Sequence, residues 1–277
     1  MQGLLEGPRL LEGKVAVITG AGSGVGRAAS LIFARHGAKV VAADVNVAAV
    51  EETVAQVIAQ GGEAIARTCD VSRAEQVTAL VAAAAEHFGR LDIMYNNAGI
   101  TNPPKPGGTP GLRTLTMVEQ DEIDLLYRVN VNGVIFGCQA ATRQFQAQHE
   151  AGQGSGGVIV NTASVVGLVG YGSVLYSSTK GAITTLTRSL AMELAGEGIR
   201  VNSVCPSGMP TNFMPGVAQS EAALASMGSI HPLGRHITAE DCANGALFLA
   251  SDLSANITGH NLPVDGGFAA GQTMKRR

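Results

Sequence analysis

The 277-residue chain has no tryptophan, 4% aromatic residues and four cysteines. The cysteines lie far apart and form no CxxC pair, so we expect neither a zinc ribbon nor a disulfide framework; they are Cys69, Cys138, Cys205 and Cys242. The six histidines contain no HExxH motif and no tight cluster, and we expect no metal centre. The formal charge of −3 and the lack of a basic face argue against a nucleic-acid partner.

Long apolar stretches are also missing. Residues 1–14 lack the apolar core of a signal peptide, and no later stretch is long enough to span a bilayer. We therefore expect a cytoplasmic protein without membrane contact. The length suits a single α/β domain, 1–277, that is large enough for a substantial core. Within it we expect an N-terminal extension at 1–10 and a C-terminal tail at 269–277.

Glycine, by contrast, is abundant, and one glycine-rich turn follows a strand-like segment. Residues 15–19 are apolar and β-branched, which predicts a buried strand, and a helical pattern at 27–35 ends before Gly37. A glycine turn between strand and helix lets backbone amides approach a pyrophosphate, although a simple tight turn is the alternative. The predicted cofactor contacts in this turn are Gly20, Ser23, Gly24, Val25 and Gly26.

A second predicted strand, 39–43, ends at Asp44. An acidic side chain about 20 residues after the glycine turn can accept hydrogen bonds from an adenosine ribose. A 2′-phosphate would meet a like charge there, and no Lys or Arg lies at 21–25 or 45–47 to neutralise it. The sequence therefore predicts NAD rather than NADP as the cofactor. Capping of the following helix by Asp44 is the alternative.

Strand-like and helical segments continue to alternate along the chain. Further strands are predicted at 65–69, 91–95, 158–161 and 199–204, with a last one inside 257–268. Ser72 and Glu75 form a capping-box signature at the start of one helix. The alternation predicts an α/β fold, a doubly wound parallel sheet of the Rossmann type with helices on both faces. Ligands of such sheets bind beyond the carboxyl ends of the strands, where polar residues of this sequence fall.

The segment 176–180 places a phenol and an ammonium four positions apart. In a helix Tyr176 and Lys180 leave the same face, one turn apart. A positive neighbour favours the phenolate and lowers the pKa of a tyrosine from about 10 toward working pH. None of the other tyrosines has a lysine at that spacing. Tyr176 is therefore the candidate proton donor and acceptor.

Together these residues resemble the short-chain dehydrogenase/reductase family, in its shorter-subunit branch, over 11–268. The matching motifs are Thr19-Gly20 with Gly24-Val25-Gly26, Asp70, Asn96-Asn97-Ala98-Gly99, Asn130, Ser164, Tyr176 with Lys180, and Val264-Asp265-Gly266-Gly267. Each motif alone is weak, but their order and separations together are specific. The resemblance implies an NAD-dependent oxidoreductase that transfers hydride between nicotinamide and a secondary alcohol or its ketone.

The resemblance also implies four catalytic residues. Tyr176 would exchange a proton with the substrate oxygen, while Lys180 would lower the pKa of Tyr176 and hold the nicotinamide ribose. Ser164 would donate a hydrogen bond to the substrate oxygen, and Asn130 would hold a water that links Lys180 to solvent. Two alternatives stay open: Ser164 could cap the turn after its strand, and Asn132 is an equally polar neighbour of Asn130.

The remaining cofactor contacts follow from the same resemblance. They are Asp70, Val71, Asn97, Ala98, Gly99, Tyr176, Lys180, Pro206, Met209 and Thr211. Asp70 and Val71 would bracket the adenine, and a helix cap is the competing role of Asp70. The sequence departs from the family at Ser207, which stands where glycine is usual.

Two segments are predicted to determine the substrate. Residues 209–233 carry apolar side chains interrupted by Pro and Gly, which predicts a lid over a substrate that is apolar or cyclic. The Pro- and Gly-rich insertion 101–112 forms either a pocket wall or a plain surface loop. The last strand is predicted to build a homotetramer. The rival functions are a catalytically idle NAD-binding sensor or scaffold, against which the catalytic set argues, and a lyase or epimerase, against which the short chain argues.

Overall fold

The protein folds around one parallel sheet of seven strands, which the computed structural model describes over residues 9–101, 114–209 and 221–271. The strand order is β3-β2-β1-β4-β5-β6-β7. The strands are β1 (Val15–Thr19), β2 (Lys39–Asp44), β3 (Glu63–Thr68), β4 (Ile93–Asn96), β5 (Gly157–Thr162), β6 (Ile199–Pro206) and β7 (Asn261–Val264). The order reverses between β1 and β4, which places the switch point of the sheet, and hence its expected ligand crevice, beside these two strands.

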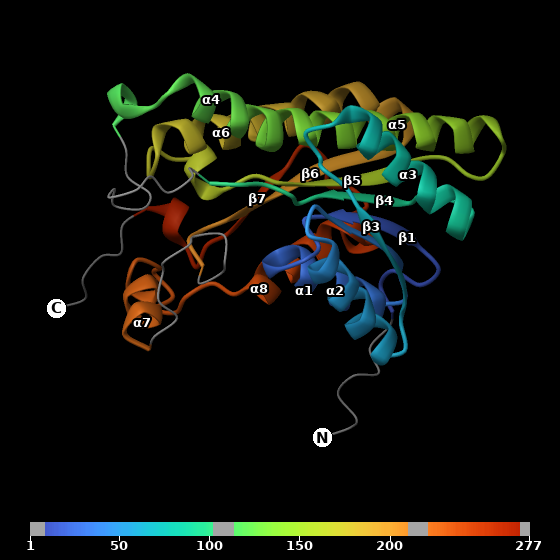
Figure 1. The fold of residues 1–277 in the computed structure, drawn as a ribbon, viewed down its shortest axis with the longest axis horizontal. Coiled ribbons are helices and arrows are strands. Elements are labelled where there is room, and N and C mark those ends of the chain that lie inside the picture. Colours follow the sequence, from blue (N-terminus) through green and yellow to red (C-terminus); the bar gives the residue numbers. More distant parts are fainter. Residues whose placement is uncertain (1–8, 102–113, 210–220, 272–277) are drawn as a thin grey trace.

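Helices cover both faces of the sheet (Figure 1). One face carries α1 (Gly24–Arg35), α2 (Val47–Ala59) and α8 (Ala239–Ala250), and the other carries α3 (Ala74–Phe88), α4 (Gln120–Tyr127), α5 (Gly133–Glu150) and α6 (Val174–Leu194). A separate apolar cluster fills each interface. Every residue of β1 is buried, because a central parallel strand is covered on both faces. The predicted doubly wound α/β sheet is confirmed.

One predicted helix start is wrong. The capping box of Ser72 and Glu75 does not form, because α3 begins only at Ala74 with Arg73 at its N-cap. Oδ1 of Asp70 accepts a hydrogen bond from the amide of Ser72 at 2.9 Å and holds it in a turn. Glu75 instead pairs with Nε of Arg73 at 2.8 Å. A local side chain thus competes successfully for the amide that the helix would use.

The predicted variable segments are described only in part. The extension 1–10 and the insertion 101–112 lie almost wholly outside the described residues. Of the predicted lid, 210–220 lies outside them, while α7 (Glu221–Ser229) forms its second half. The predicted tail, 269–277, begins inside a 3₁₀ turn, η6 (Phe268–Ala270). Among the described residues, no helix combines the length and the apolar character needed to cross a membrane.

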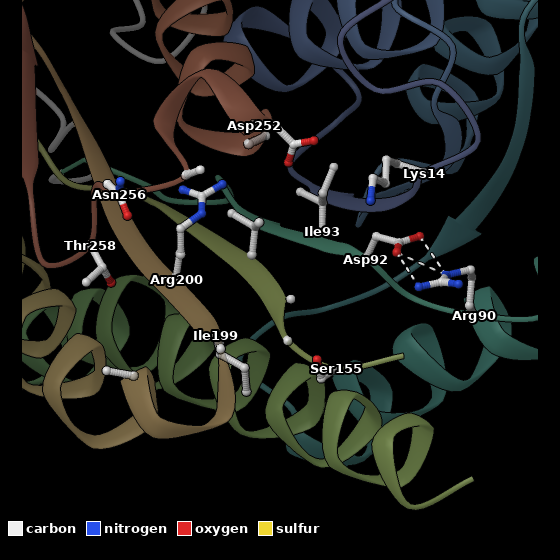
Figure 2. Close-up of a pocket in the computed structure, with 17 residues that line it drawn as sticks. Lys14, Arg90, Asp92, Ile93, Ser155, Ile199, Arg200, Asp252, Asn256 and Thr258 are labelled. Atoms are coloured by element: carbon white, nitrogen blue, oxygen red, sulfur yellow. Dashed lines mark hydrogen bonds and ion pairs between the residues drawn. The ribbon is translucent and has the colours of Figure 1, made fainter. Parts of the chain in front are cut away.

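A cavity of about 480 Å³ lies at the amino ends of β4, β5 and β6, the end of the sheet opposite to the predicted site (Figure 2). Its two arginines are held by the chain itself. Nη2 of Arg90 lies 2.7 Å from Oδ1 of Asp92, and the guanidinium of Arg200 donates to the carbonyls of Leu249 and Ser251 at 2.9 and 3.1 Å. Both guanidinium groups are therefore already neutralised or hydrogen-bonded by the chain, and neither is left to bind an anionic ligand.

Candidate active site

The glycine turn fits tightly between the ends of β1 and β4. Gly20 has φ of +66°, and a Cβ on it would lie 2.8 Å from Cα of Ala98. A Cβ on Gly26 would overlap the carbonyl oxygen of Gly20. Glycine is therefore required at both positions, first for a left-handed backbone and then for the close passage of α1 over the turn. This requirement explains why glycines stand at these two places of the turn.

The amino end of α1 is suited to an anion. The helix begins at Gly24, its N-cap Ser23 makes no side-chain capping bond, and its first turn, which contains Val25, has no acidic residue. The first amides of a helix have no partner within it, and they carry the positive end of the helix dipole. No negative side chain of the first turn competes for that position, so the pyrophosphate of a dinucleotide fits it.

Asp44 ties the end of β2 to the glycine turn. Its Oδ2 accepts a hydrogen bond from the amide of Gly22 at 2.9 Å, and its Oδ1 accepts one from the amide of Asn46 at 3.0 Å. The cap of α2 is Asn46, whose Oδ1 accepts from the amide of Ala49 at 3.1 Å. The alternative role of Asp44 as a helix cap is therefore wrong. Each carboxylate oxygen keeps a lone pair for a further donor, such as a ribose hydroxyl.

Arg27 reaches the same region, which the sequence argument missed. Its Nη2 donates to the carbonyl of Gly22 at 2.7 Å and lies 3.0 Å from Oε2 of Glu52, while Nε donates to Thr53 at 3.1 Å. Arg27 lies outside 21–25 and 45–47, the segments next to the turn and to Asp44 in the sequence, and its long side chain reaches back to the turn. Glu52 neutralises Arg27, so this cation does not by itself reverse the expected preference against a 2′-phosphate.

A small network of hydrogen bonds joins the ends of β1 and β4. Oγ1 of Thr19 accepts from the amides of Asn97 and Ala98 at 3.0 and 3.1 Å. Nδ2 of Asn97 returns a bond to the carbonyl of Thr19 at 3.0 Å. Asn97 and Ala98 thus hold the two strand ends together, and Thr19 shapes the site although the sequence argument gave it no role there.

Ser164 and Tyr176 meet where β5 and α6 converge. Tyr176, half-buried in the first turn of α6, is hydrogen-bonded to Ser164. The Ser164 hydroxyl also lies 3.2 Å from the carbonyl of Pro206 and accepts from the amide of Val166 at 3.4 Å, which caps a 3₁₀ turn, η3 (Val165–Gly167). Capping of the turn by Ser164 does not exclude its expected role beside the substrate oxygen, since the same hydroxyl caps the turn and contacts the phenol of Tyr176.

Lys180 is buried one turn further along α6, with 3% of its surface exposed. Its Nζ donates to the carbonyl of Thr162 at 2.8 Å and lies 5.7 Å from the centre of the Tyr176 ring. Burial lowers the pKa of Lys180 to about 8. Thr162 takes part through a backbone oxygen, which a search for side-chain patterns does not detect.

The expected direction of the Tyr176 pKa is wrong for the folded chain. Burial raises that pKa, and the hydrogen bond with Ser164 only partly opposes the rise. The ammonium of Lys180 lies over the ring face. Loss of hydration therefore outweighs the attraction of a positive neighbour for a phenolate. The segment 176–180 does place both groups on one helix, as the spacing predicts.

Asn130 lies in a wide π-turn, η2 (Arg128–Asn132), between α4 and α5. It is fully buried, whereas Asn132 is exposed, which favours Asn130 as the internal amide. Its side chain accepts from the amide of Ile100 at 2.8 Å and donates to the Ile100 carbonyl at 2.9 Å. A Cβ on Gly99 would lie 3.2 Å from Oδ1 of Asn130 and 3.5 Å from Nζ of Lys180, so these groups converge around Gly99.

The other predicted contacts are placed less directly. The carboxylate of Asp70 holds the turn before α3 and does not cap that helix, and Val71 is packed beneath Gly133, where an added Cβ would lie 2.9 Å from Cγ2 of Val71. Pro206 ends β6 beside Ser164, and Met209 is half-buried. Thr211 lies outside the described residues. No group of three His, Cys, Asp or Glu side chains in the described ranges could hold a metal ion.

The assembled groups are those of a proton-exchange site beside a dinucleotide cradle. Two hydroxyls, Ser164 and Tyr176, share a hydrogen bond, and a buried ammonium lies one helical turn away. Such a pair can bind a substrate oxygen and pass a proton to or from it. The glycine turn and Asp44 lie at the same end of the sheet, because parallel strands carry their carboxyl ends to one edge.

Comparisons with known proteins agree with this geometry. A protein-family model described as enoyl-(acyl carrier protein) reductase matches residues 20–269. A 2,5-dichloro-2,5-cyclohexadiene-1,4-diol dehydrogenase, LinX, of Sphingobium indicum is 38% identical over 269 residues, covering 94% of this chain and 98% of the relative. The cyclohexanol dehydrogenase of an Acinetobacter species is 36% identical over 261 residues, 93% and 95% of the two chains. A crystal structure of a short-chain type dehydrogenase/reductase from Mycobacterium marinum has a TM-score of 0.81 at 32% identity, and the match covers 94% and 97%.

Proposed function

The chain belongs to the short-chain dehydrogenase/reductase family of oxidoreductases, and we propose that it is an NAD-dependent dehydrogenase for an apolar, cyclic secondary alcohol or the corresponding ketone. The observation that carries this proposal is the hydrogen-bonded pair of Ser164 and Tyr176 with Lys180 buried beside it. A protein that only binds a dinucleotide has no need of these three side chains at the end of the sheet.

In the proposed reaction a bound nicotinamide would supply the hydride acceptor for the alcohol and the hydride donor for the ketone. Ser164 turns its hydroxyl from Pro206 toward the substrate oxygen and stabilises the charge that develops there. Tyr176 takes the hydroxyl proton of the alcohol during oxidation and gives it back during reduction. Lys180 holds the nicotinamide ribose, and we propose that its positive charge opposes part of the rise in the Tyr176 pKa that burial causes. Asn130 holds the water that connects Lys180 to solvent.

NAD is the proposed cofactor because of Asp44. Its carboxylate lies beside the amide of Gly22, where an adenosine ribose would reach it. A ribose hydroxyl can donate to the carboxylate, whereas a 2′-phosphate is repelled by it, and Arg27 is paired with Glu52. The pyrophosphate would lie on the amino end of α1, and the adenine between Asp70 and Val71.

The proposed substrate class rests on the relatives and on the apolar character of 209–233. The two relatives described above are named for cyclohexanol and for a chlorinated cyclohexadienediol, both of them cyclic alcohols. Residues 209–233 contain several large apolar side chains, which suits a substrate of low polarity. We retain the lid at 209–233 and the substrate wall at 101–112 as proposals.

Assembly and compartment are proposed in the same way. β7 is an edge strand of the sheet, and an isologous pairing of two such edges would supply one two-fold axis of the proposed homotetramer. The four cysteines are free and buried, which suits a reducing cytoplasm.

Replacement of Tyr176 by Phe tests the proposal. With NAD and cyclohexanol, we expect kcat to fall by about 10²–10⁴, the usual contribution of general acid–base catalysis, while the affinity for NADH changes less than threefold. Initial rates and NADH fluorescence titration measure the two quantities. Tyr127→Phe is the matched control, since it removes an exposed tyrosine hydroxyl that donates a hydrogen bond to Ser178, a residue of the helix that carries Tyr176.

Two outcomes would contradict the proposal. Near-normal turnover in Tyr176→Phe would remove the assigned proton donor. A wild-type protein that binds NADH tightly but oxidises no alcohol and reduces no ketone in a broad panel would favour the sensor or scaffold role.

A further inference from the structure

A serine and a histidine form an internal hydrogen bond where β6 ends. Oγ of Ser207 and Nε2 of His231 lie 2.9 Å apart, and 24 positions separate the two residues in the chain. Both are buried, with 8% and 2% of their surfaces exposed. Ser207 follows β6 directly, and His231 lies just after α7, so this bond ties the end of β6 to the end of α7.

The direction of the bond follows from the other ring nitrogen. Nδ1 of His231 lies 3.1 Å from the carbonyl oxygen of Arg235, which can only accept. Nδ1 therefore carries the proton in the neutral ring, and Nε2 is left as an acceptor for the hydroxyl of Ser207. Glycine, which the family resemblance places at position 207, has no donor for this bond. A chain with glycine at this position would therefore lack the contact.

The neighbouring backbone leaves the pair little freedom. The amide of Leu233 donates to the carbonyl of Gly266 at 3.0 Å, and that of Ser207 donates to the carbonyl of Val264 at 3.2 Å. A Cβ on Gly266 would lie 3.0 Å from Cβ of His231. Three segments therefore meet at His231, namely the end of β6, the residues after α7 and the turn after β7.

Aromatic contacts extend this junction toward the proton-exchange site. The ring of Phe268 meets the His231 ring edge-on with centroids 6.5 Å apart, and it meets the Tyr171 ring edge-on at 5.0 Å. Tyr171 lies between Ser164 and Tyr176 in the chain, and its carbonyl accepts a hydrogen bond from Ser177 at 3.0 Å. The contacts thus run from β6 through His231 and Phe268 to the first turn of α6.

We propose that Ser207 and His231 are positioning residues that hold α7 and the Tyr171–Phe268 pair as one wall of the substrate site, and that this wall selects for ring-shaped substrates. The proposal rests on the proposed function of the site. A wall of two aromatic rings contacts a six-membered ring over a large area but contacts a three-carbon alcohol very little. Its positioning therefore affects the binding of cyclic substrates and leaves the proton and hydride steps unaffected.

Ser207→Ala and two His231 variants separate this role from general stability. Ser207→Ala removes the donor, and we expect the KM for cyclohexanol to rise about 3- to 10-fold, the effect of one lost buried hydrogen bond. We expect kcat, the KM for propan-2-ol and the Kd for NADH to change less than twofold. His231→Gln supplies an acceptor for Ser207 and should restore part of the cyclohexanol KM, whereas His231→Leu should not. Ser229→Ala, which loses an exposed hydroxyl bond to Ser226, is the control.

Hydrogen exchange gives a readout that needs no turnover. The amides of His231, Leu233 and Gly234 are bonded to Gly228, Gly266 and His231, and they should exchange at least tenfold faster in Ser207→Ala than in Ser229→Ala. Unchanged exchange, or an equal KM rise for both alcohols, would overturn the proposal. If exchange accelerates in Ser207→Ala while the wild type oxidises no alcohol, the positioning role of Ser207 and His231 is supported and the proposed enzyme activity is contradicted.

Discussion

A buried lysine should make the stability of this protein rise with pH. Burial lowers the pKa of Lys180 from 10.5 to about 8, so the folded chain releases this proton at lower pH than the unfolded chain does. Between these two values the unfolded state binds more protons, and stability therefore increases as the pH rises. Lys180→Met removes the titrating group and with it this dependence.

The magnitude follows from the two pKa values. At pH 7 the ammonium is present in both states, and its burial costs about 3 kcal/mol, at about 1.4 kcal/mol for each tenfold difference. At pH 9.5 the folded lysine is neutral and the unfolded one still binds most of its proton, which leaves a cost of about 1 kcal/mol by the same relation. The stability difference between wild type and Lys180→Met should therefore change by about 2 kcal/mol in favour of the wild type. The lost bond to Thr162 adds an offset that is the same at both pH values.

Urea unfolding of both proteins at pH 7 and pH 9.5 measures this change, provided that each unfolds in one transition. Lys14→Met is the matched control, because Lys14 is exposed and loses little hydration on folding. A flat difference for Lys180→Met, or one that moves against the wild type, would refute the lowered pKa. It would also mean that Lys180 stays fully protonated well above pH 8.

Three further predictions test other parts of the site. Asp44→Ala should reduce the ratio of the NADP to the NAD dissociation constant at least tenfold, mainly by weakening the binding of NAD, and fluorescence titrations of both reduced cofactors measure this ratio. Glu51→Gln, a change at an exposed residue of α2, should leave the ratio unchanged. An unaltered ratio in Asp44→Ala would exclude the carboxylate as the group that selects the cofactor. Gly137→Ala should cost at least about 2 kcal/mol in urea unfolding, because its Cβ would overlap Oδ1 of Asn96, while Gly196→Ala, with no atom within 4 Å, should cost nothing. Light scattering should give about four times the chain mass of 28.3 kDa, and a monomer would contradict the proposed pairing of β7 edges.

The parts of the fold that repeat along the chain were predictable from the sequence. Runs such as Val15–Thr19 are buried on both faces, and the spacing of Tyr176 and Lys180 is that of one helical turn, so both signals are local. The start of α3 was not predictable in this way, because Asp70 captures the amide of Ser72 before the helix can use it.

The features that the sequence argument missed depend on distance in space. The reach of Arg27 to Gly22 and the backbone role of Thr162 become visible only once the turns are folded. The direction of the Tyr176 pKa depends on how much water folding removes, and a pair of residues four positions apart does not carry that information. Ser207 stands out in the sequence as a departure from the family, but its partner His231 lies too far along the chain to be inferred from it.

The wide turn at Arg128–Asn132 also sets the phase of the long helical run around it. Buried side chains recur at every fourth position from Glu122 through Leu126, Asn130 and Val134 to Cys138. A regular helix advances about 100° per residue, so 16 residues would carry the last of these roughly 160° around the axis from the first. One extra residue in a wide turn removes about 100° of that drift. The run therefore presents one continuous inner stripe, and the amide of Asn130 lies on it rather than in solvent.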